Sequence, residues 1–207
     1  MPELLDFVVI GAGIAGASAA YRLVQHGKTA LLDMEAQPGY HSTGRSAAQF
    51  TELYGNGPIR ALVRLSKDFL IDPPEGFSES PILTTRGAMF VATAEQRPTI
   101  EAFLRMAKNE NCPVRELGAS DARDIVPVLQ PEAFESAVLE PESTDMDVHA
   151  LHGGFLQGFR ASGGVVFTDA EAKGLERQGG VWRVDTPAGE FEAPVIVNAA
   201  GAWGCLL

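Results

Sequence analysis

Residues 6–28 read DFVVIGAGIAGASAAYRLVQHGK, and this stretch decides how the first part of the chain folds. The preceding MPELLD is acidic, whereas a signal peptide begins with a basic region. Glycines and the polar pair Tyr21 and Arg22 interrupt the apolar run, and a membrane span needs about 20 apolar residues. The pattern instead predicts a strand over 7–10, a glycine turn, a helix over 14–25 and a second buried strand over 29–32, which together form a βαβ unit.

The glycine turn has GxGxxG spacing between a predicted strand and a predicted helix. Gly11 allows a tight turn, Gly13 leaves room for a diphosphate to approach the backbone, and Gly16 lets the helix pack closely on the strand. Ile14 and Ala15 begin the helix, whose free N–H groups and partial positive charge favour an anion. This context predicts a dinucleotide site; a close-packed turn without a ligand is the alternative.

Acidic residues follow the second predicted strand, at the place where a carboxylate accepts hydrogen bonds from ribose hydroxyls. Asp33 and Glu35 are both candidates for this role, because the pattern does not fix the end of the strand. Met34 lies between them and is included in the predicted site. A carboxylate would repel a 2′-phosphate, so NADP is disfavoured.

The remaining pattern predicts an α/β fold, in which a Rossmann-like nucleotide-binding lobe contains an inserted mixed α+β lobe. The expected boundaries are 1–50, 51–145 and 146–207. Further helices are predicted over 59–71, 94–109, 119–125 and 148–161. Further strands are predicted over 81–93, 136–140, 164–175, 181–186 and, as a pair, 190–199, with a turn at 179–180.

The composition argues against nucleic-acid and anionic-lipid partners, because 27 acidic residues oppose 16 basic ones and give a net charge of −11. Cys112 and Cys205 form no CxxC pair, which favours reduced thiols in a cytoplasmic protein. His149 and His152 have helical spacing, but no third ligand accompanies them. No metal site is therefore expected.

Four further stretches carry a resemblance to a known family. They are GYHSTGRSAA at 39–48, IVPVL at 125–129, DMDVHALHGGF at 145–155 and VNAAGAW at 197–203. Together with GAGIAG, they resemble the FAD-dependent D-amino-acid dehydrogenase and oxidase family, which includes glycine and sarcosine oxidases. The bacterial D-arginine dehydrogenase type is the most similar. The resemblance covers nearly the whole chain.

The resemblance implies FAD as cofactor and a small-molecule amino acid or amine as substrate. The CH–NH bond of the substrate would be oxidised by hydride transfer to the flavin, with the protein supplying orientation and electrostatics. The electron acceptor stays open, so oxidase and dehydrogenase are not distinguished. Small and hydroxyl residues suit a flat ring, and Arg45 suits a phosphate. The residues expected along FAD, besides those of the turn and the acids, are Ser42, Thr43, Arg45, Ser46, Ala47, Ala48, Ala172, Ala199, Ala200 and Gly201.

Substrate residues are also implied by the resemblance. Tyr54 matches a substrate-side tyrosine, and Gln49 stands where the D-arginine dehydrogenase type has a histidine. Glutamine forms hydrogen bonds but does not titrate. Ala88 stands where that type has a glutamate selecting cationic side chains. A smaller or more apolar amino acid is therefore expected.

Family members are considerably longer, and GAWGCLL lacks the acidic residue that usually follows AGAW. We therefore expect an N-terminal portion or a shifted reading frame. Strands that become edges predict a homo-oligomer or poor solubility. Two other functions remain open: a catalytically inactive flavin-binding fragment or interaction module, and an FAD-dependent enzyme of 2-hydroxy acids.

Overall fold

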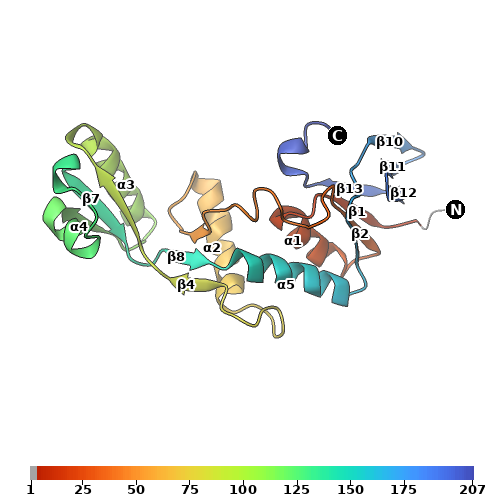
Figure 1. Ribbon diagram of the computed structural model, residues 1–207, viewed down its shortest axis with the longest axis horizontal. Coiled ribbons are helices and arrows are strands. Elements are labelled where there is room, and N and C mark those ends of the chain that lie inside the picture. Colours follow the sequence, from red (N-terminus) through yellow and green to blue (C-terminus); the bar gives the residue numbers. More distant parts are fainter. Residues whose placement is uncertain (1–3) are drawn as a thin grey trace. The chain divides into compact units, whose positions relative to one another are not determined.

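The structure, a computed structural model, describes residues 4–207 and divides them into two compact units (Figure 1). Unit 1 comprises the described residues up to Ala47, together with Pro74–Ser80 and Val148–Leu207. Unit 2 comprises Ala48–Pro73 and Pro81–Asp147. The sequence placed the inserted lobe at 51–145, whereas the contacts assign Pro74–Ser80 to unit 1.

A parallel sheet forms the centre of unit 1. Its strands are β1 (Phe7–Ile10), β2 (Thr29–Leu32), β9 (Val165–Phe167) and β13 (Val195–Asn198), in the order β13-β1-β2-β9. All four residues of β2 are buried. Continuous burial of this kind is expected where both faces of a parallel sheet are covered.

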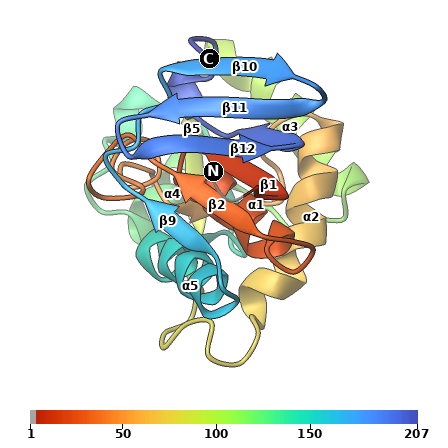
Figure 2. The ribbon, with the colours of Figure 1, turned by 90° about the vertical axis from the view of Figure 1, so that its right-hand side faces the viewer.

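The two faces of this sheet have different covers, and Figure 2 shows them as successive layers. Helices α1 (Ile14–Leu23) and α5 (Val148–Ala161) lie on one face. An antiparallel meander of β10 (Gly174–Gln178), β11 (Val181–Thr186) and β12 (Gly189–Ala193) lies on the other. Val8, Ile10 and Leu32 alternate toward the meander and pack with its buried residues.

An aromatic contact attaches Pro74–Ser80 to unit 1. The ring centroid of Phe77 lies 5.1 Å from that of Phe155 and 5.9 Å from that of Tyr21. A Cβ on Gly154 of α5 would come within 2.4 Å of the Phe77 ring. This close approach explains why a segment between two parts of unit 2 belongs to unit 1.

Unit 2 has an antiparallel sheet of β5 (Ala88–Ala92), β7 (Ser136–Glu140) and β6 (Arg115–Gly118), in the order β5-β7-β6. Helix α3 (Arg97–Asn109) packs on the face that carries Ala92 and Val138. Helix α4 (Ala119–Ile125) packs on the opposite face, which carries Ala137. Alternation along β7 therefore provides both small cores.

A second small sheet of unit 2 consists of β3 (Gln49–Phe50), β8 (Thr144–Met146) and β4 (Leu83–Thr85), in the order β3-β8-β4. Helix α2 (Gly57–Ile71) is attached by ion pairs: Arg60 and Arg64 both contact Glu110, and Lys67 contacts Glu52. Short 3-10 helices complete the chain, η1 (Ala94–Gln96) and η2 (Pro131–Ala133) in unit 2 and η3 (Gly201–Trp203) in unit 1.

Several predicted bounds are confirmed, namely 7–10, 29–32, 119–125, 136–140, 148–161 and 181–186. The single strand predicted over 164–175 is wrong: β9 ends at Phe167, and the chain bends through Asp169, whose φ is +52°. The strand predicted over 81–93 is broken at Gly87, which has φ +80°. No helix within 4–207 is long and apolar enough to cross a membrane.

Candidate functional site

The glycine turn between β1 and α1 is packed so closely that it excludes side chains. Gly11 has φ +97°, and a Cβ there would lie 2.4 Å from the carbonyl oxygen of Ala199. A Cβ on Gly16 would lie 1.7 Å from the carbonyl oxygen of Gly11. These contacts confirm the expected tight turn and the close packing of helix on strand.

Asp33, directly after β2, is tied to the glycine turn. Its Oδ2 accepts a hydrogen bond of 2.7 Å from the N–H of Ala12, and its Oδ1 accepts one of 2.9 Å from the N–H of Glu35. The residue is only 9% exposed. Each carboxylate oxygen has two acceptor positions, so one on each remains for a ligand hydroxyl.

The N-terminus of α1 has no side-chain cap of its own, because Gly13 stands at the N-cap. The N–H of Ile14 instead donates a 2.9 Å hydrogen bond to Oγ1 of Thr43. Thr43 belongs to a run of turns after β2, over residues 38–45. The loop is thereby attached to the helix terminus.

A cleft of about 420 Å³ lies beside this turn, entirely within unit 1. Its walls come from the ends of β1 and β2, the loop over 39–43, the segment 170–173 and the segment 199–203. The predicted residues that line it are Gly11, Gly13, Ile14, Ala15, Asp33, Met34, Ser42, Thr43, Ala172, Ala199, Ala200 and Gly201. Parallel strands thus deliver a cleft at their carboxyl ends, where α/β sheets bind ligands.

Other predicted residues lie outside the lining. Gly16 packs beneath the turn. Glu35 is engaged elsewhere, since its Oε1 lies 2.7 Å from His41 Nε2. The guanidinium of Arg45 lies over the Tyr40 ring, 4.9 Å from its centroid. Ser46, Ala47 and Ala48 also lie outside the lining, and Ala48 has φ +56°.

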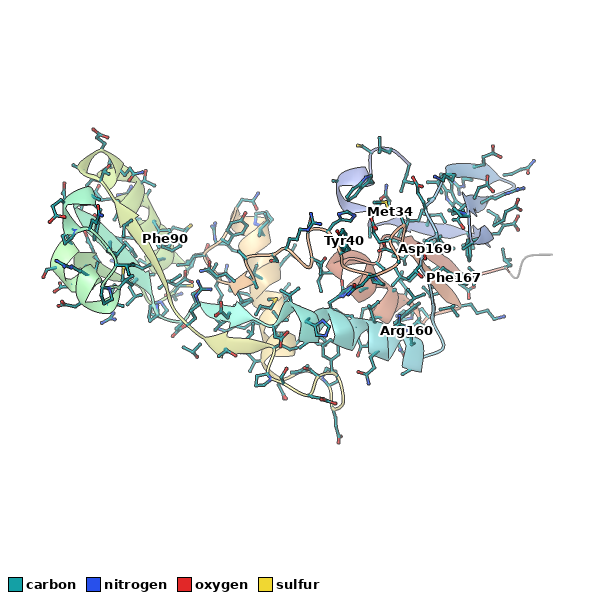
Figure 3. The ribbon with its side chains drawn as sticks, viewed as in Figure 1. Met34, Tyr40, Phe90, Arg160, Phe167 and Asp169 are labelled. Atoms are coloured by element: carbon teal, nitrogen blue, oxygen red, sulfur yellow. The ribbon has the colours of Figure 1, made fainter. Side chains whose placement is uncertain are left out.

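Aromatic side chains line the cleft where the sequence analysis named only small and hydroxyl residues. His41 stacks against Trp203 with ring centroids 4.5 Å apart, and Tyr40 meets His41 edge-on at 5.1 Å. Tyr40 and Met34 are labelled on this loop in Figure 3. GYHSTG and AGAW both contained these rings, but only the fold brings the two motifs together.

The predicted substrate residues belong to unit 2. Tyr54 exposes 71% of its surface, and Gln49 donates a 2.8 Å hydrogen bond from Nε2 to Ser143 Oγ. Ser143 in turn donates to the carbonyl oxygen of Phe50 at 3.2 Å. The side chain of Gln49 is therefore held by the unit 2 framework.

A buried acid that sequence reasoning missed lies near this segment. Glu140 is 5% exposed and pairs across the sheet with Ala88. Its Oε1 accepts a 2.6 Å hydrogen bond from the Thr51 hydroxyl, whereas its Oε2 has no hydrogen-bond partner. Burial raises the pKa of Glu140 above its ordinary value, and the Thr51 hydrogen bond opposes this only in part. No sequence pattern marked this acid, because β7 reads as a plain apolar strand.

The thiols and histidines form no metal centre in the described part of the chain, where no group of three or more potential ligands is found. Cys112 and Cys205 are both free, and burial raises the pKa of the Cys112 thiol. Of the two histidines noted in the sequence, His149 is exposed. His152 is buried, with its Nε2 at 2.8 Å from the carbonyl oxygen of Ala12.

Sequence comparison finds relatives that extend over almost the entire chain. L-2-hydroxyglutarate dehydrogenase of Escherichia coli is 26% identical over 210 residues, covering 96% of this chain and 48% of the relative. The anaerobic glycerol-3-phosphate dehydrogenase of Escherichia coli contains a polypeptide that is 28% identical over 216 residues, covering 96% of this chain and 38% of the relative. The chain therefore spans half or less of the length of these curated relatives.

Solved structures share the fold at lower identity. Glycine oxidase from Geobacillus kaustophilus superposes with a TM-score of 0.87 and 20% identity, over 98% of this chain and 56% of that one. L-alpha-glycerophosphate oxidase from Mycoplasma pneumoniae, whose structure has FAD bound, gives 0.84 and 18%, over 97% and 55%. The sequence pattern of the FAD dependent oxidoreductase family, abbreviated DAO, matches residues 6–207. Since this match spans both units, the chain belongs to the FAD dependent oxidoreductase family.

Proposed function

We propose that unit 1 binds FAD in the cleft beside the glycine turn, and that the chain forms part of an oxidoreductase acting on the CH–NH bond of a small amino acid. One observation carries the first part. The cleft is lined both by the uncapped first residues of α1 and by the carboxylate of Asp33. An anion and a ribose are the two groups that such a pair recognises.

The residues present fit the diphosphate of FAD. A Cβ on Gly13 would lie 3.2 Å from Thr43 Oγ1, so a larger residue there would crowd the place where the loop meets the helix. Thr43 accepts the N–H of Ile14 and retains its own hydroxyl hydrogen. We infer that Thr43 donates this hydrogen to a phosphate oxygen, while the α1 dipole stabilises the negative charge.

The ribose role goes to Asp33 and not to Glu35. Asp33 lines the cleft and is oriented by two N–H groups, whereas Glu35 lies outside the lining and contacts His41. Main-chain donors also hold Asp33 as an acceptor at neutral pH. Arg45 is not assigned to the phosphate, because its guanidinium lies over Tyr40.

Bound FAD would supply the two-electron acceptor that the protein side chains lack. For the substrate we propose an amino acid of the D-series with a small or apolar side chain. Ala88 supports this choice, because an alanine offers no charge to a cationic side chain. Gln49 and Tyr54 would hold the substrate by hydrogen bonds, and Gln49 would not carry a proton.

A second substrate class has its own support. The curated relatives include an L-2-hydroxyglutarate dehydrogenase and a polypeptide of a glycerol-3-phosphate dehydrogenase, whose names specify CH–OH substrates. A 2-hydroxy acid is therefore the second candidate. A flavin-binding chain without catalysis is the third. A homo-oligomer and a cytoplasmic location both remain predictions from the sequence.

The test begins with the purified 207-residue chain and added FAD. We expect stoichiometric binding, followed by quenching of flavin fluorescence, and bleaching of the flavin band by a D-amino acid under anaerobic conditions. Bleaching by 2-hydroxy acids alone would transfer the proposal to the second class. Binding without bleaching by either panel would support the third, and failure to bind FAD would refute the cofactor assignment to this cleft.

A further inference from the structure

We propose that His152 is a positioning residue for the cofactor cleft, holding the glycine turn and the loop over 39–43 in the arrangement that receives the diphosphate. The inference rests on the proposed FAD site, which it deepens. His152 lies on α5 and does not line the cleft. Its effect on a ligand would therefore pass through the backbone that it contacts.

The first contact of His152 is with the glycine turn. Its Nε2 lies 2.8 Å from the carbonyl oxygen of Ala12, and a carbonyl oxygen only accepts hydrogen bonds. Nε2 therefore carries a hydrogen, which fixes the tautomer of the neutral ring. The side chain is 8% exposed, so water competes little for this bond.

The same residue of the turn is held on its other side. The N–H of Ala12 donates to Asp33 Oδ2 at 2.7 Å, within the buried interior. Two side chains from different elements, one after β2 and one on α5, thus fix both polar groups of a single residue. Rotation of either adjoining peptide plane would break at least one of these bonds, and the N–H groups of Gly13 and Ile14 follow directly in the chain.

The second contact of His152 is with the loop. Gly39 has φ +80°, and a Cβ there would lie 2.8 Å from Cε1 of the imidazole. The ring therefore supports the beginning of the loop that carries Tyr40, His41 and Thr43 to the cleft. The Thr43–Ile14 hydrogen bond joins the loop to the turn at its other end.

Two substitutions separate positioning from simple packing. His152→Leu keeps an apolar volume and removes the donor, whereas His152→Gln places an amide N–H near the position of Nε2. His149→Gln is the matched control, because His149 is exposed on the same helix. We expect the FAD dissociation constant to rise at least tenfold in His152→Leu and to stay within threefold of wild type in the two glutamine variants.

A second measurement does not depend on FAD. Amide hydrogen exchange at Ala12 in the ligand-free chain reports whether the turn is held. We expect exchange at Ala12 to become at least tenfold faster in His152→Leu and to be restored in His152→Gln. If wild type binds no FAD, the proposed function fails, whereas the exchange rate still decides whether His152 holds the turn.

The proposal is overturned by either of two results. One is a His152→Leu chain with reduced thermal stability but an FAD dissociation constant within twofold of wild type and unchanged exchange at Ala12. The other is a His152→Gln chain as impaired as the leucine variant. If His152→Leu does not fold, His152→Asn replaces it. The shorter asparagine amide does not reach the carbonyl of Ala12, so it should impair binding and exchange protection where glutamine does not.

Discussion

Units 1 and 2 use buried polar side chains in opposite ways. In unit 1, Asp33 and His152 are both buried, and both hold the backbone of Ala12 beside a cleft. In unit 2, Glu140 is equally buried, but its Oε2 has no partner. The difference indicates that unit 1 is organised in advance for a ligand. Unit 2 retains a destabilising buried group whose cost depends on its protonation state.

Gly16→Ala is expected to have the largest effect, because it breaks the closest packing in unit 1. The new Cβ would lie 1.7 Å from the carbonyl oxygen of Gly11, which is backbone and has little room to move. We expect a loss of at least about 3 kcal/mol in the free energy of unfolding, beyond the usual range for overpacking. Urea denaturation followed by circular dichroism measures it.

Gly153→Ala is the matched control in the same unit. Gly153 lies inside α5, and a Cβ there meets no atom within 4 Å. We expect it to stabilise the chain by about 0.5–1 kcal/mol, because alanine favours helix over glycine. Equal effects at the two glycines would contradict the packing that the structure gives to the turn.

Asp33→Asn comes next and tests the organisation of the cleft. Asparagine has one acceptor oxygen, so one of the N–H groups of Ala12 and Glu35 loses its partner. We expect a loss of about 1–3 kcal/mol in the free energy of unfolding. We also expect FAD affinity to fall at least tenfold in a fluorescence titration. A variant that loses stability but binds FAD as wild type would remove Asp33 from the ribose role.

The comparison also explains what could be predicted from the sequence. The βαβ unit was predictable because its signals are local: β-branched runs, glycine spacing and a following acid. Glu35 and Arg45 were not placed correctly at a ligand, because their actual partners, His41 and Tyr40, depend on how the turns after β2 fold. The end of β9 was missed because the N–H of Ala170 donates to the carbonyl of Asp33, a contact distant in sequence.

Trp203 and His152 show the same limit at the site itself. Both lie in motifs that the sequence analysis quoted, but their roles depend on contacts with the loop after β2 and with the glycine turn. In unit 2, β3, β6 and β8 are strands of two to four residues. Such short strands carry little periodicity, so pairing with β7 or with β4 defines them.

Glu140→Gln tests the unit 2 side of the comparison through pH. Burial raises the pKa of Glu140 in the folded state above its unfolded value. Stability from this group is therefore fully present below the unfolded pKa and is lost as pH rises through the folded pKa. We expect wild type to lose on the order of 1 kcal/mol between about pH 4 and 8 from this group. The glutamine variant, which still accepts from Thr51, should lack that component, and parallel pH profiles would show that Glu140 is not the cause.

The ion pair of Arg86 and Asp145 gives the smallest expected effect and completes the contrast. Both side chains are at least half exposed, and they join β8 to the turn between β4 and β5 in unit 2. A double-mutant cycle with Arg86→Met and Asp145→Asn should give a coupling of about 0–1 kcal/mol, because water solvates both charges. The coupling should fall further at about 1 M salt, where the screening length is about 3 Å. A coupling that exceeds the loss in Asp33→Asn and persists in salt would mean that charges in unit 2 are held as rigidly as those around Ala12, and the contrast between the units would fail.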